Sequence, residues 1–229
     1  MDELTARLHL ETSKLMGVDF LPTSDVEAEQ PLPVSSLPSV DISATSLEDI
    51  QQLHATTCPH CTTVTSHTQI VFGIGNPNAS LMFIGDAPGP EEDAEGIPFV
   101  GAAGQKLDQI ISAMGFSRDD VYITNVVKSR LEDTRTPLPT EVKKCGEFLE
   151  LQIQAIQPDV IVALGSPATK YLLQTTIGIT KLRGVWGEHC SIPVMPTYHP
   201  AYLLRNYTKQ TREEIWSDMQ NVLAKLSTK

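Results

Sequence analysis

Asp86 stands where the sequence can present a carboxylate to a ligand. Residues 81–84 form an apolar run that predicts a buried strand, and the Asp-Ala-Pro-Gly turn after Gly85 cannot extend it. In an open α/β sheet, ligands bind beyond the carboxyl ends of the strands. The sequence therefore predicts a carboxylate at the mouth of a cleft. The alternative is an acidic surface loop that closes a strand–helix unit, since three further acids stand at positions 91–93.

Cys58 and Cys61 form a second candidate for chemistry, because they have the C-x2-C spacing of many metal sites. The chain has four cysteines at uneven spacing, a pattern that favours metal binding or packing over disulfides. Zinc held by His54, Cys58, Cys61 and His67 is chemically possible. A lone C-x2-C pair is also compatible with ordinary core residues, so both interpretations stay open.

The elements that must position these residues alternate along the chain. Apolar runs predict strands at 69–72, 81–84, 121–124, 160–164 and 192–195. Helical periodicity predicts helices at 47–55, 102–114, 140–157 and 212–226, with Ser46 capping the first and Ser166 capping a helix after the fourth strand. Strands that alternate with helices predict a doubly wound, mostly parallel α/β sheet flanked by helices.

The first 46 residues differ in composition from the rest. Residues 1–16 predict a short amphipathic helix, and residues 17–46 are rich in proline, serine and acids and predict a disordered linker. Residues 47–229 are then one globular domain. The sequence has no apolar run of the roughly 18 residues that span a bilayer and no signal-peptide pattern at its start. We expect a cytoplasmic protein with no membrane partner.

The net charge of −11 is unevenly distributed. Ten acids and two bases lie in residues 1–50, which leaves a net charge of −3 for the other 179 residues. A nucleic-acid partner therefore stays possible, because it needs a basic strip and not a basic protein. Candidates for such a strip are Lys181, Arg183, Arg205, Lys209 and Arg212.

Four segments resemble one known family. Residues 85–104, GDAPGPEEDAEGIPFVGAAG, closely resemble the first motif of the family 4 uracil-DNA glycosylases, and residues 199–205, HPAYLLR, resemble the second. TNVVKSR at 124–130 and the strand at 159–165 lie between them in the expected order. The resemblance covers about residues 47–226. It implies a uracil-DNA glycosylase-like three-layer sandwich that hydrolyses the N-glycosidic bond of deoxyuridine, releasing uracil and leaving an abasic site for base excision repair.

The resemblance assigns two catalytic residues. Bond cleavage builds positive charge on the sugar and negative charge on the departing uracil, and the site must stabilise both. Asp86 matches the acid near the sugar, although the family usually has glutamate there. His199 matches the donor to uracil O2, for which a neutral imidazole suffices. No lysine is positioned by motif for a Schiff base, so we expect a monofunctional glycosylase without strand cleavage.

The same resemblance implies contacts to the flipped base. Phe99 would stack on it, and Asn125 would offer a donor and an acceptor to the Watson–Crick edge of uracil. Glu92 stands where the family crowds the thymine methyl, and the backbone N–H groups of Asp86 and Ala87 would face the base. The three side chains have plainer alternatives: a core phenylalanine, a turn asparagine and an exposed loop acid.

Residues 199–205 also resemble the family's DNA-intercalating loop. Tyr202, Leu203 and Leu204 would provide an apolar wedge that fills the gap left by the flipped nucleotide. Arg205 would meet a phosphate. The implied partner is uracil-containing DNA, single- or double-stranded, and we expect the protein to act as a monomer.

Family 4 enzymes carry a [4Fe-4S] cluster on four cysteines. Cys58, Cys61 and Cys145 match three of these ligands, but Ser129 stands at the expected third-ligand position and Cys190 lies elsewhere. A hydroxyl is a poor substitute for a thiolate on iron. A cluster with one non-cysteine ligand, a labile cluster and no cluster are the three outcomes left open.

Two other functions compete with the glycosylase hypothesis. The changes at Asp86 and Ser129 suggest a degenerate homologue that binds uracil or damaged DNA without efficient cleavage. A different nucleotide hydrolase on the same sheet is the third hypothesis. Against it, the sequence contains no G-x-x-x-x-G-K-[ST] loop and no G-x-G-x-x-G motif after a strand.

Overall fold

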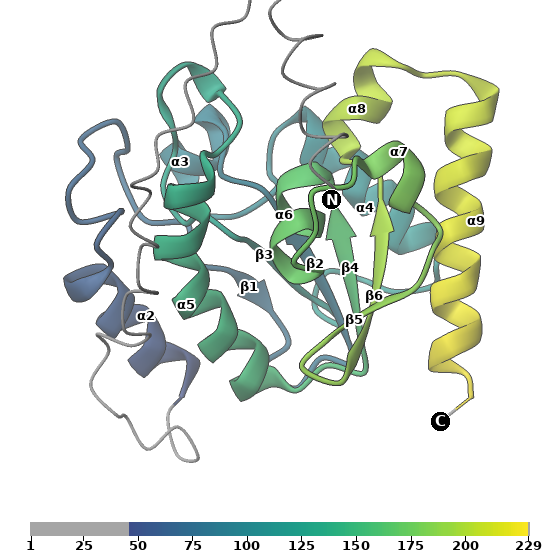
Figure 1. Ribbon diagram of the computed structural model, residues 1–229, viewed down its shortest axis with the longest axis horizontal. Helices are drawn as coiled ribbons and strands as arrows, with labels where there is room; N and C mark the ends of the chain where they lie inside the picture. The colour runs from purple at the N-terminus through teal and green to yellow at the C-terminus, as the bar shows by residue number, and fades with distance from the viewer. Residues whose placement is uncertain (1–45, 229) are drawn as a thin grey trace, which may run out of the picture. The chain divides into compact units, whose positions relative to one another are not determined.

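Six strands form the central sheet of this computed structural model, which describes residues 46–228 (Figure 1). They are β1 (Ile74–Gly75), β2 (Leu81–Gly85), β3 (Tyr122–Asn125), β4 (Val160–Leu164), β5 (Gly187–His189) and β6 (Ile192–Thr197). Their order is β1-β3-β2-β4-β6-β5. The four central strands are parallel, and each edge strand is antiparallel to its neighbour. The predicted doubly wound, mostly parallel sheet is confirmed.

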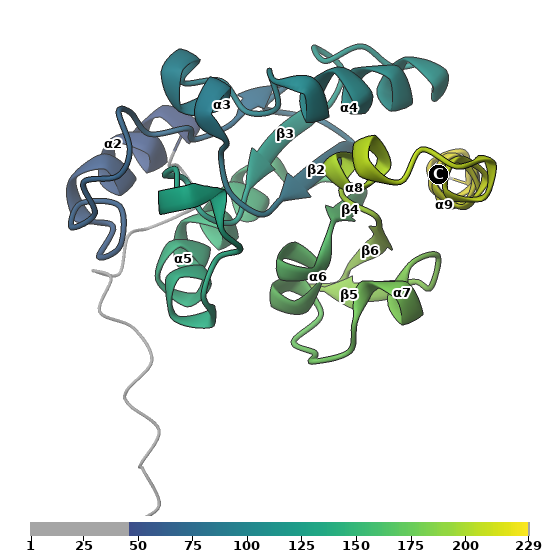
Figure 2. The same cartoon turned by 90° about the horizontal axis from the view of Figure 1, so that it is seen from above.

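Helices cover both faces of this sheet (Figures 1 and 2). The longer ones are α2 (Leu47–Thr57), α4 (Ala102–Ala113), α5 (Pro139–Ile156) and α9 (Lys209–Leu226). The shorter ones are α3 (Pro90–Glu95), α6 (Ser166–Leu172), α7 (Ile179–Leu182), α8 (Pro200–Arg205) and the 3-10 turn η2 (Glu132–Thr134). Among the described residues, no helix is both long and apolar enough to cross a bilayer.

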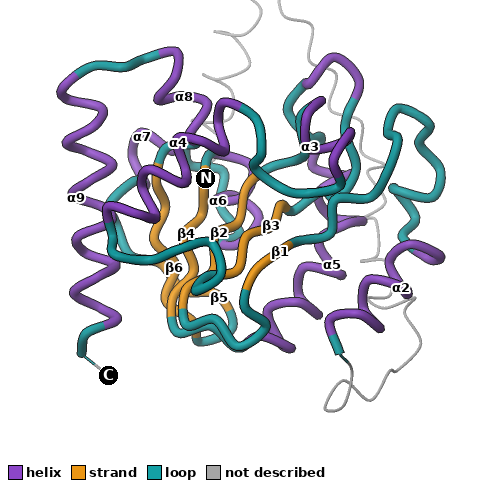
Figure 3. Tube along the Cα trace, turned by 180° about the vertical axis from the view of Figure 1, so that it is seen from behind, coloured by secondary structure: helices purple, strands orange, loops and turns teal. Residues whose placement is uncertain are grey.

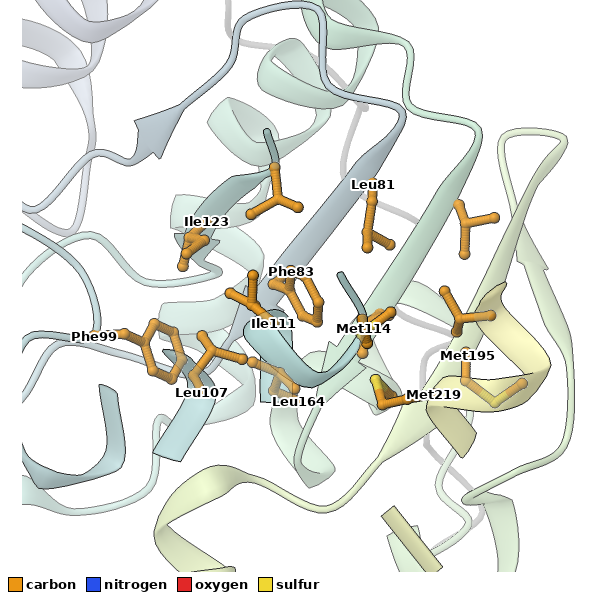
Figure 4. Close-up of a cluster of buried hydrophobic side chains, with 14 residues drawn as sticks. Leu81, Phe83, Phe99, Leu107, Ile111, Met114, Ile123, Leu164, Met195 and Met219 are labelled. Atoms are coloured by element: carbon orange, nitrogen blue, oxygen red, sulfur yellow. The ribbon is translucent and has the colours of Figure 1, made fainter. Parts of the chain in front are cut away.

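The main core lies between the sheet and the helices α4 and α9 (Figure 4). Alternate side chains of a strand point to the same face, so the parallel strands contribute one row each to this layer. It includes Leu81, Phe83 and Ile123 from the sheet, Leu107 and Ile111 from α4, and Met219 from α9. On the other face, α6 packs on β2 and β4, α5 packs on α6, and α2 packs on α5. Figure 3 shows the same arrangement from behind, with the strands in orange and the helices in purple.

Helix starts follow their local signals with one exception. Ser46 caps α2 in a capping box with Asp49, as predicted, since the Asp49 N–H donates to Ser46 Oγ (3.2 Å) and the Ser46 N–H to Asp49 Oδ2 (3.1 Å). Ser166 is not a cap: it is the first residue of α6, and Gly165, with φ 93°, occupies the cap position.

The predicted strand at 69–72 is wrong. Val71 N–H donates to Lys128 O (2.8 Å), but the Phe72 carbonyl accepts from two side chains, Thr124 Oγ1 (2.7 Å) and Gln152 Nε2 (3.1 Å). Side chains thus occupy the acceptor that a strand ladder would use, and pairing with β3 starts only at Ile74. The predicted helix at 1–16 and the linker at 17–46, apart from Ser46, lie outside the described residues, so this division stays a prediction.

Candidate active site

The carboxyl ends of the four parallel strands meet at one edge of the sheet. The strand register pairs Gly85 with Asn125, Ile84 with Ala163, and Leu164 with Thr197. The residues that follow these pairs therefore emerge together. This is the edge at which open α/β sheets bind ligands.

Asp86 and His199 lie beside each other around Gly165. A Cβ atom built at Gly165 would stand 3.1 Å from His199 Cβ and 3.2 Å from Asp86 Oδ2. The φ of 93° favours glycine, and a Cβ atom at these distances would push His199 or Asp86 away by a few tenths of an ångström. The structure thus brings the predicted acid and imidazole, which are far apart in sequence, to one point. The sequence analysis did not single out Gly165; its place directly after a buried parallel strand is the signal that could have found it.

The imidazole of His199 is held as a neutral donor. Its Nδ1 accepts the Ala201 N–H (3.1 Å), so in the neutral ring the proton resides on Nε2. Burial lowers the pKa of His199 to about 4, and the positive charge of Arg205 acts in the same direction. At neutral pH this side chain can therefore donate one hydrogen bond from Nε2.

The carboxyl group of Asp86 is desolvated. Burial raises its pKa to about 7, opposed by the Ala168 N–H, which donates to Oδ1 at 3.1 Å. A carboxylate in such surroundings has few competing water contacts. Its charge is therefore only weakly screened at the point where it faces Gly165 and His199.

A pocket of about 250 Å³ opens beside this pair, a size for one flat base, since pockets for drug-sized ligands start at about 300 Å³. Asp86 does not line it, but its neighbour Ala87 and its companion His199 do. Of the predicted substrate contacts, the lining includes Ala87, Glu92, Phe99 and Asn125. It also includes Thr134, which the sequence analysis did not consider.

Phe99 is fixed against His199. The two rings stack with centroids 5.6 Å apart and planes 30° apart, and Phe99 is 4% exposed. The Phe99 backbone has φ 55°, an uncommon value for a bulky residue. Arg118 holds this turn, because its guanidinium donates to Phe99 O (2.8 Å) and Pro98 O (2.6 Å) and pairs with Asp108 (2.8 Å). No sequence signal pointed to Arg118.

Glu92 holds the loop of the pocket together. Its carboxylate accepts three backbone N–H groups, from Gly89 (3.0 Å), Val100 (3.1 Å) and Gly101 (3.1 Å). The side chain is buried, which rules out the exposed loop acid that the sequence left open. Glu92 therefore shapes the pocket wall through the backbone that it binds.

Asn125 is buried at the pocket with an unused acceptor. It is 2% exposed, and its Oδ1 has no hydrogen-bond partner among the described residues. The backbone carbonyl of Asn125 accepts a hydrogen bond from Lys128 Nζ (2.5 Å), and the Asn125 side chain packs against Gly85. A buried acceptor without a partner costs about 1–3 kcal/mol unless a ligand satisfies it.

Helix α8 begins at His199 and presents its next residues beside the site. Tyr202 is half-buried and stacks on Tyr198 (4.6 Å), while Arg205 is exposed. Leu203 is 6% exposed and lies under α9, whereas Leu204 is 40% exposed. Of the two leucines, Leu204 is the one that can reach a partner, so the burial does not support a DNA contact by Leu203.

One predicted member of the basic strip is occupied elsewhere. Arg183 forms an ion pair with the buried Asp218, which also accepts from Thr197 Oγ1 (2.7 Å). The hydrogen bond from Thr197 to Asp218 ties the end of β6 to α9 and so supports the loop that carries His199. Lys209 lies 3.6 Å from Glu213 in an exposed pair, which leaves Lys181, Arg205 and Arg212 as the stronger phosphate candidates.

Three cysteines and one histidine gather between α2 and α5. The ligand atoms of His54, Cys58, Cys61 and Cys145 all lie within 4.8 Å of one another, and the four side chains are buried. These residues could hold a metal. Ser129 lies beside Cys61, and its buried hydroxyl has no hydrogen-bond partner among the described residues. His67 is not in this group, so the zinc set suggested by the sequence is wrong in that member.

Comparisons with known proteins identify the family. The model of the uracil DNA glycosylase superfamily matches residues 72–220. The chain belongs to this superfamily and, within it, to the type-4 uracil-DNA glycosylases. It is 43% identical over 169 residues to the type-4 uracil-DNA glycosylase of Thermotoga maritima, a match that covers 71% of this chain and 86% of the relative. The type-4 enzyme of Archaeoglobus fulgidus is 41% identical, with 77% and 92% covered, and that of Sulfurisphaera tokodaii is 45% identical, with 70% and 77% covered.

Proposed function

We propose that this protein removes uracil from DNA by hydrolysing the N-glycosidic bond of deoxyuridine and leaves an abasic site. The observation that carries the proposal is the meeting of Asp86 and His199 around Gly165, at the mouth of a base-sized pocket. The family membership and the type-4 relatives support the same reaction. Because the acid and the imidazole are both in place, cleavage is better supported than binding alone.

The two residues have separate tasks in this mechanism. The carboxylate of Asp86 stabilises the positive charge that develops on the sugar and orients the attacking water. His199 donates from Nε2 to O2 of the departing uracil and stabilises its negative charge. Phe99, held against His199, provides the stacking surface for the extruded base.

The activity assay distinguishes this proposal from the binding alternative. Oligonucleotides with one uracil, single- and double-stranded, are incubated with the full-length protein, and abasic sites are then cleaved with alkali. We expect strand breaks at the uracil and intact strands when alkali is omitted, because the reaction is monofunctional. Uncleaved substrate that is still shifted in a gel would support binding without catalysis. Release of uracil from free deoxyuridine monophosphate but not from DNA would support a nucleotide hydrolase.

Asn125 carries a prediction about base choice. Uracil presents a donor at N3 and an acceptor at O4, which a carboxamide can match, whereas cytosine presents a donor at N4. Asn125→Asp should lower uracil release about 10- to 100-fold, the range expected from about 1–3 kcal/mol for one matched pair, and should raise release of cytosine. Rates on matched uracil and cytosine oligonucleotides measure this. Asn78→Asp, the same charge change at an exposed position, is the control, and an unaltered base preference in Asn125→Asp would remove the assignment.

DNA would cross the site along α8 and the start of α9. In this proposal Leu204, which is 40% exposed, fills the gap left by the flipped nucleotide, Tyr202 lies beside it and Arg205 meets a phosphate. The same surface continues to Tyr207, which is 57% exposed and lies 4.9 Å from Lys106 Nζ and 5.0 Å from the Arg212 guanidinium. Aromatic and basic groups side by side are typical of nucleic-acid surfaces.

Arg205 tests this path. Arg205→Gln should weaken binding to uracil-containing and uracil-free DNA alike, and it should reduce the slope of log K against log salt by about 1, because one phosphate contact is lost. Fluorescence anisotropy at several salt concentrations measures both quantities. Lys143→Gln, on α5 away from α8, should leave the slope unchanged. An unchanged slope in Arg205→Gln would place the DNA elsewhere.

The metal group would support the fold of the site and would not take part in bond cleavage. The chain after Cys61 is tied to the pocket elements, since Asp93 of α3 accepts the Thr68 N–H (2.8 Å) and Ser66 Oγ donates to Arg130 O (3.0 Å). The resemblance to the family would put a [4Fe-4S] cluster here, and Cys58, Cys61 and Cys145 supply three of the four cysteines that such a cluster needs. Ser129 stands where the remaining cysteine is expected, so the fourth protein ligand is either Ser129 or another residue.

Two further expectations concern the oligomeric state and the cellular compartment. Action as a monomer stays a prediction. None of the four cysteines, all of which lie among the described residues, forms a disulfide, which is usual in a reducing compartment and supports a cytoplasmic location.

A further inference from the structure

The group of His54, Cys58, Cys61 and Cys145 has the spacing of ligands around one ion. Cys145 Sγ lies 3.5 Å from Cys58 Sγ, 3.1 Å from Cys61 Sγ and 3.9 Å from His54 Nε2. With zinc–sulfur bonds of about 2.3 Å, the edge of a tetrahedron of thiolates is about 3.8 Å. In a [4Fe-4S] cluster each thiolate binds a different iron, and the four bonds diverge from separate corners, so the sulfurs stand farther apart. The observed sulfurs at 3.1 and 3.5 Å would have to move apart by less than about 1 Å to surround a single ion and by more to hold a cluster, so the single ion is the nearer fit.

His54 is directed to this group by its surroundings. It lies on α2, four residues before Cys58, and it is 0% exposed. Phe148 packs edge-on against the ring at 4.8 Å and Phe72 lies at 6.0 Å, which fixes the ring with Nε2 toward Cys145. Nδ1 has no hydrogen-bond partner among the described residues. A buried imidazole without an ordinary hydrogen bond is costly, and ligation of a metal by Nε2 would offset that cost.

Ser129 is the competing fourth ligand, and its chemistry is less suitable. A serine hydroxyl at neutral pH keeps its proton and is a hard donor, whereas zinc in protein sites favours thiolate and imidazole. His54 has its ligand atom within 4.8 Å of all three cysteine sulfurs. His54 can therefore supply the fourth ligand in the absence of a cysteine at position 129.

We propose that His54 is the fourth ligand of a Cys3His site that holds a single tetrahedral Zn²⁺ with Cys58, Cys61 and Cys145, in place of a [4Fe-4S] cluster. Ser129 is then a neighbour of the site and not a ligand. On binding, the three thiols lose their protons to solvent and His54 stays neutral. The proposal does not depend on the glycosylase activity, because metal content, metal coordination and unfolding are all measured without DNA.

The first test uses the unmodified, full-length protein. After anaerobic purification we expect about one zinc per chain, no acid-labile sulfide and no absorbance band in the visible blue. X-ray absorption at the zinc edge should give three sulfur neighbours at about 2.3 Å and one nitrogen at about 2.0–2.1 Å. Iron with acid-labile sulfide, or a zinc shell without nitrogen, would overturn the proposal. Failure of metal-free protein to bind added Zn²⁺ would do the same.

The second test uses variants. His54→Ala should weaken Zn²⁺ affinity at least about 10-fold in a chelator competition and lower the unfolding temperature. His54→Cys should restore both, because it returns a fourth zinc ligand, and this separates ligation from packing. Ser129→Ala and Cys190→Ser are the matched controls, and both should keep the metal. Wild-type affinity in His54→Ala, or loss of zinc in Ser129→Ala, would overturn the assignment.

Discussion

Asp86→Asn is expected to lower the rate of uracil release by two or more orders of magnitude. The substitution keeps the size of the side chain and the acceptor for the Ala168 N–H, but it removes the negative charge beside Gly165. Loss of one group that stabilises charge in the transition state typically costs about 10²–10³ in rate. Single-turnover cleavage of a uracil oligonucleotide measures the effect.

The pKa of Asp86 gives this prediction a second readout. Burial raises that pKa to about 7, and the mechanism needs the ionised form. The cleavage rate of the unmodified protein should therefore rise with pH and level off above about pH 7. The step should be absent in Asp86→Asn. His199 adds no step in this range, because its pKa of about 4 keeps it neutral throughout.

The stability of the folded protein should fall as pH rises, which is opposite to the expected change in cleavage rate. The folded-state pKa of Asp86 is raised above its ordinary value of 3.8, so the folded protein favours the protonated acid. Its contribution to stability is present at low pH and is lost as pH rises through about 7. Asp86→Asn should thus have a higher unfolding temperature than the unmodified protein at pH 8. Asp86→Glu, which keeps the charge, should stay closer to the original activity; near-normal cleavage by Asp86→Asn would remove the catalytic assignment.

His199→Ala is expected to cause a loss of similar size, for a different reason. The substitution removes the Nε2 donor to uracil O2 and also the ring on which Phe99 stacks. The lost donor alone is expected to cost about 10²–10³ in rate. His199→Gln retains a donor group and should recover part of this loss. The rates are compared at saturating protein, so that weaker DNA binding does not contribute.

A structural cause for the His199 effect can be separated from a chemical one. His199 Nδ1 accepts the Ala201 N–H and so contributes to the start of α8. If the rate fell only because α8 was displaced, affinity for uracil-free DNA would fall with it. We expect that affinity to stay within a few-fold of the original. Normal turnover in His199→Ala would mean that another group carries the departing charge.

Local sequence determined the elements and the chemical groups at their ends. The buried strand β2, the turn that stops it at Asp86 and the helix cap at Ser46 depend on neighbouring residues, and all three are present as predicted. Motifs at 85–104 and 199–205 were enough to point to the family. The strand at 69–72 failed because the Phe72 acceptor is taken by Thr124 and Gln152, which only the folded chain brings near.

Tertiary structure decided which of these groups act together. The meeting of Asp86 and His199 needs the register of four parallel strands and the absence of a side chain at Gly165. The choice of Leu204 over Leu203 depends on which side of α8 packs under α9, and the place of His54 among the cysteines depends on the packing of α2 on α5. Local hydrogen bonds and the apolar periodicity of single elements involve only neighbouring residues, so they can be recognised in the sequence. Contacts between distant segments are fixed by the packing of the whole core, and for that reason only the structure contains them.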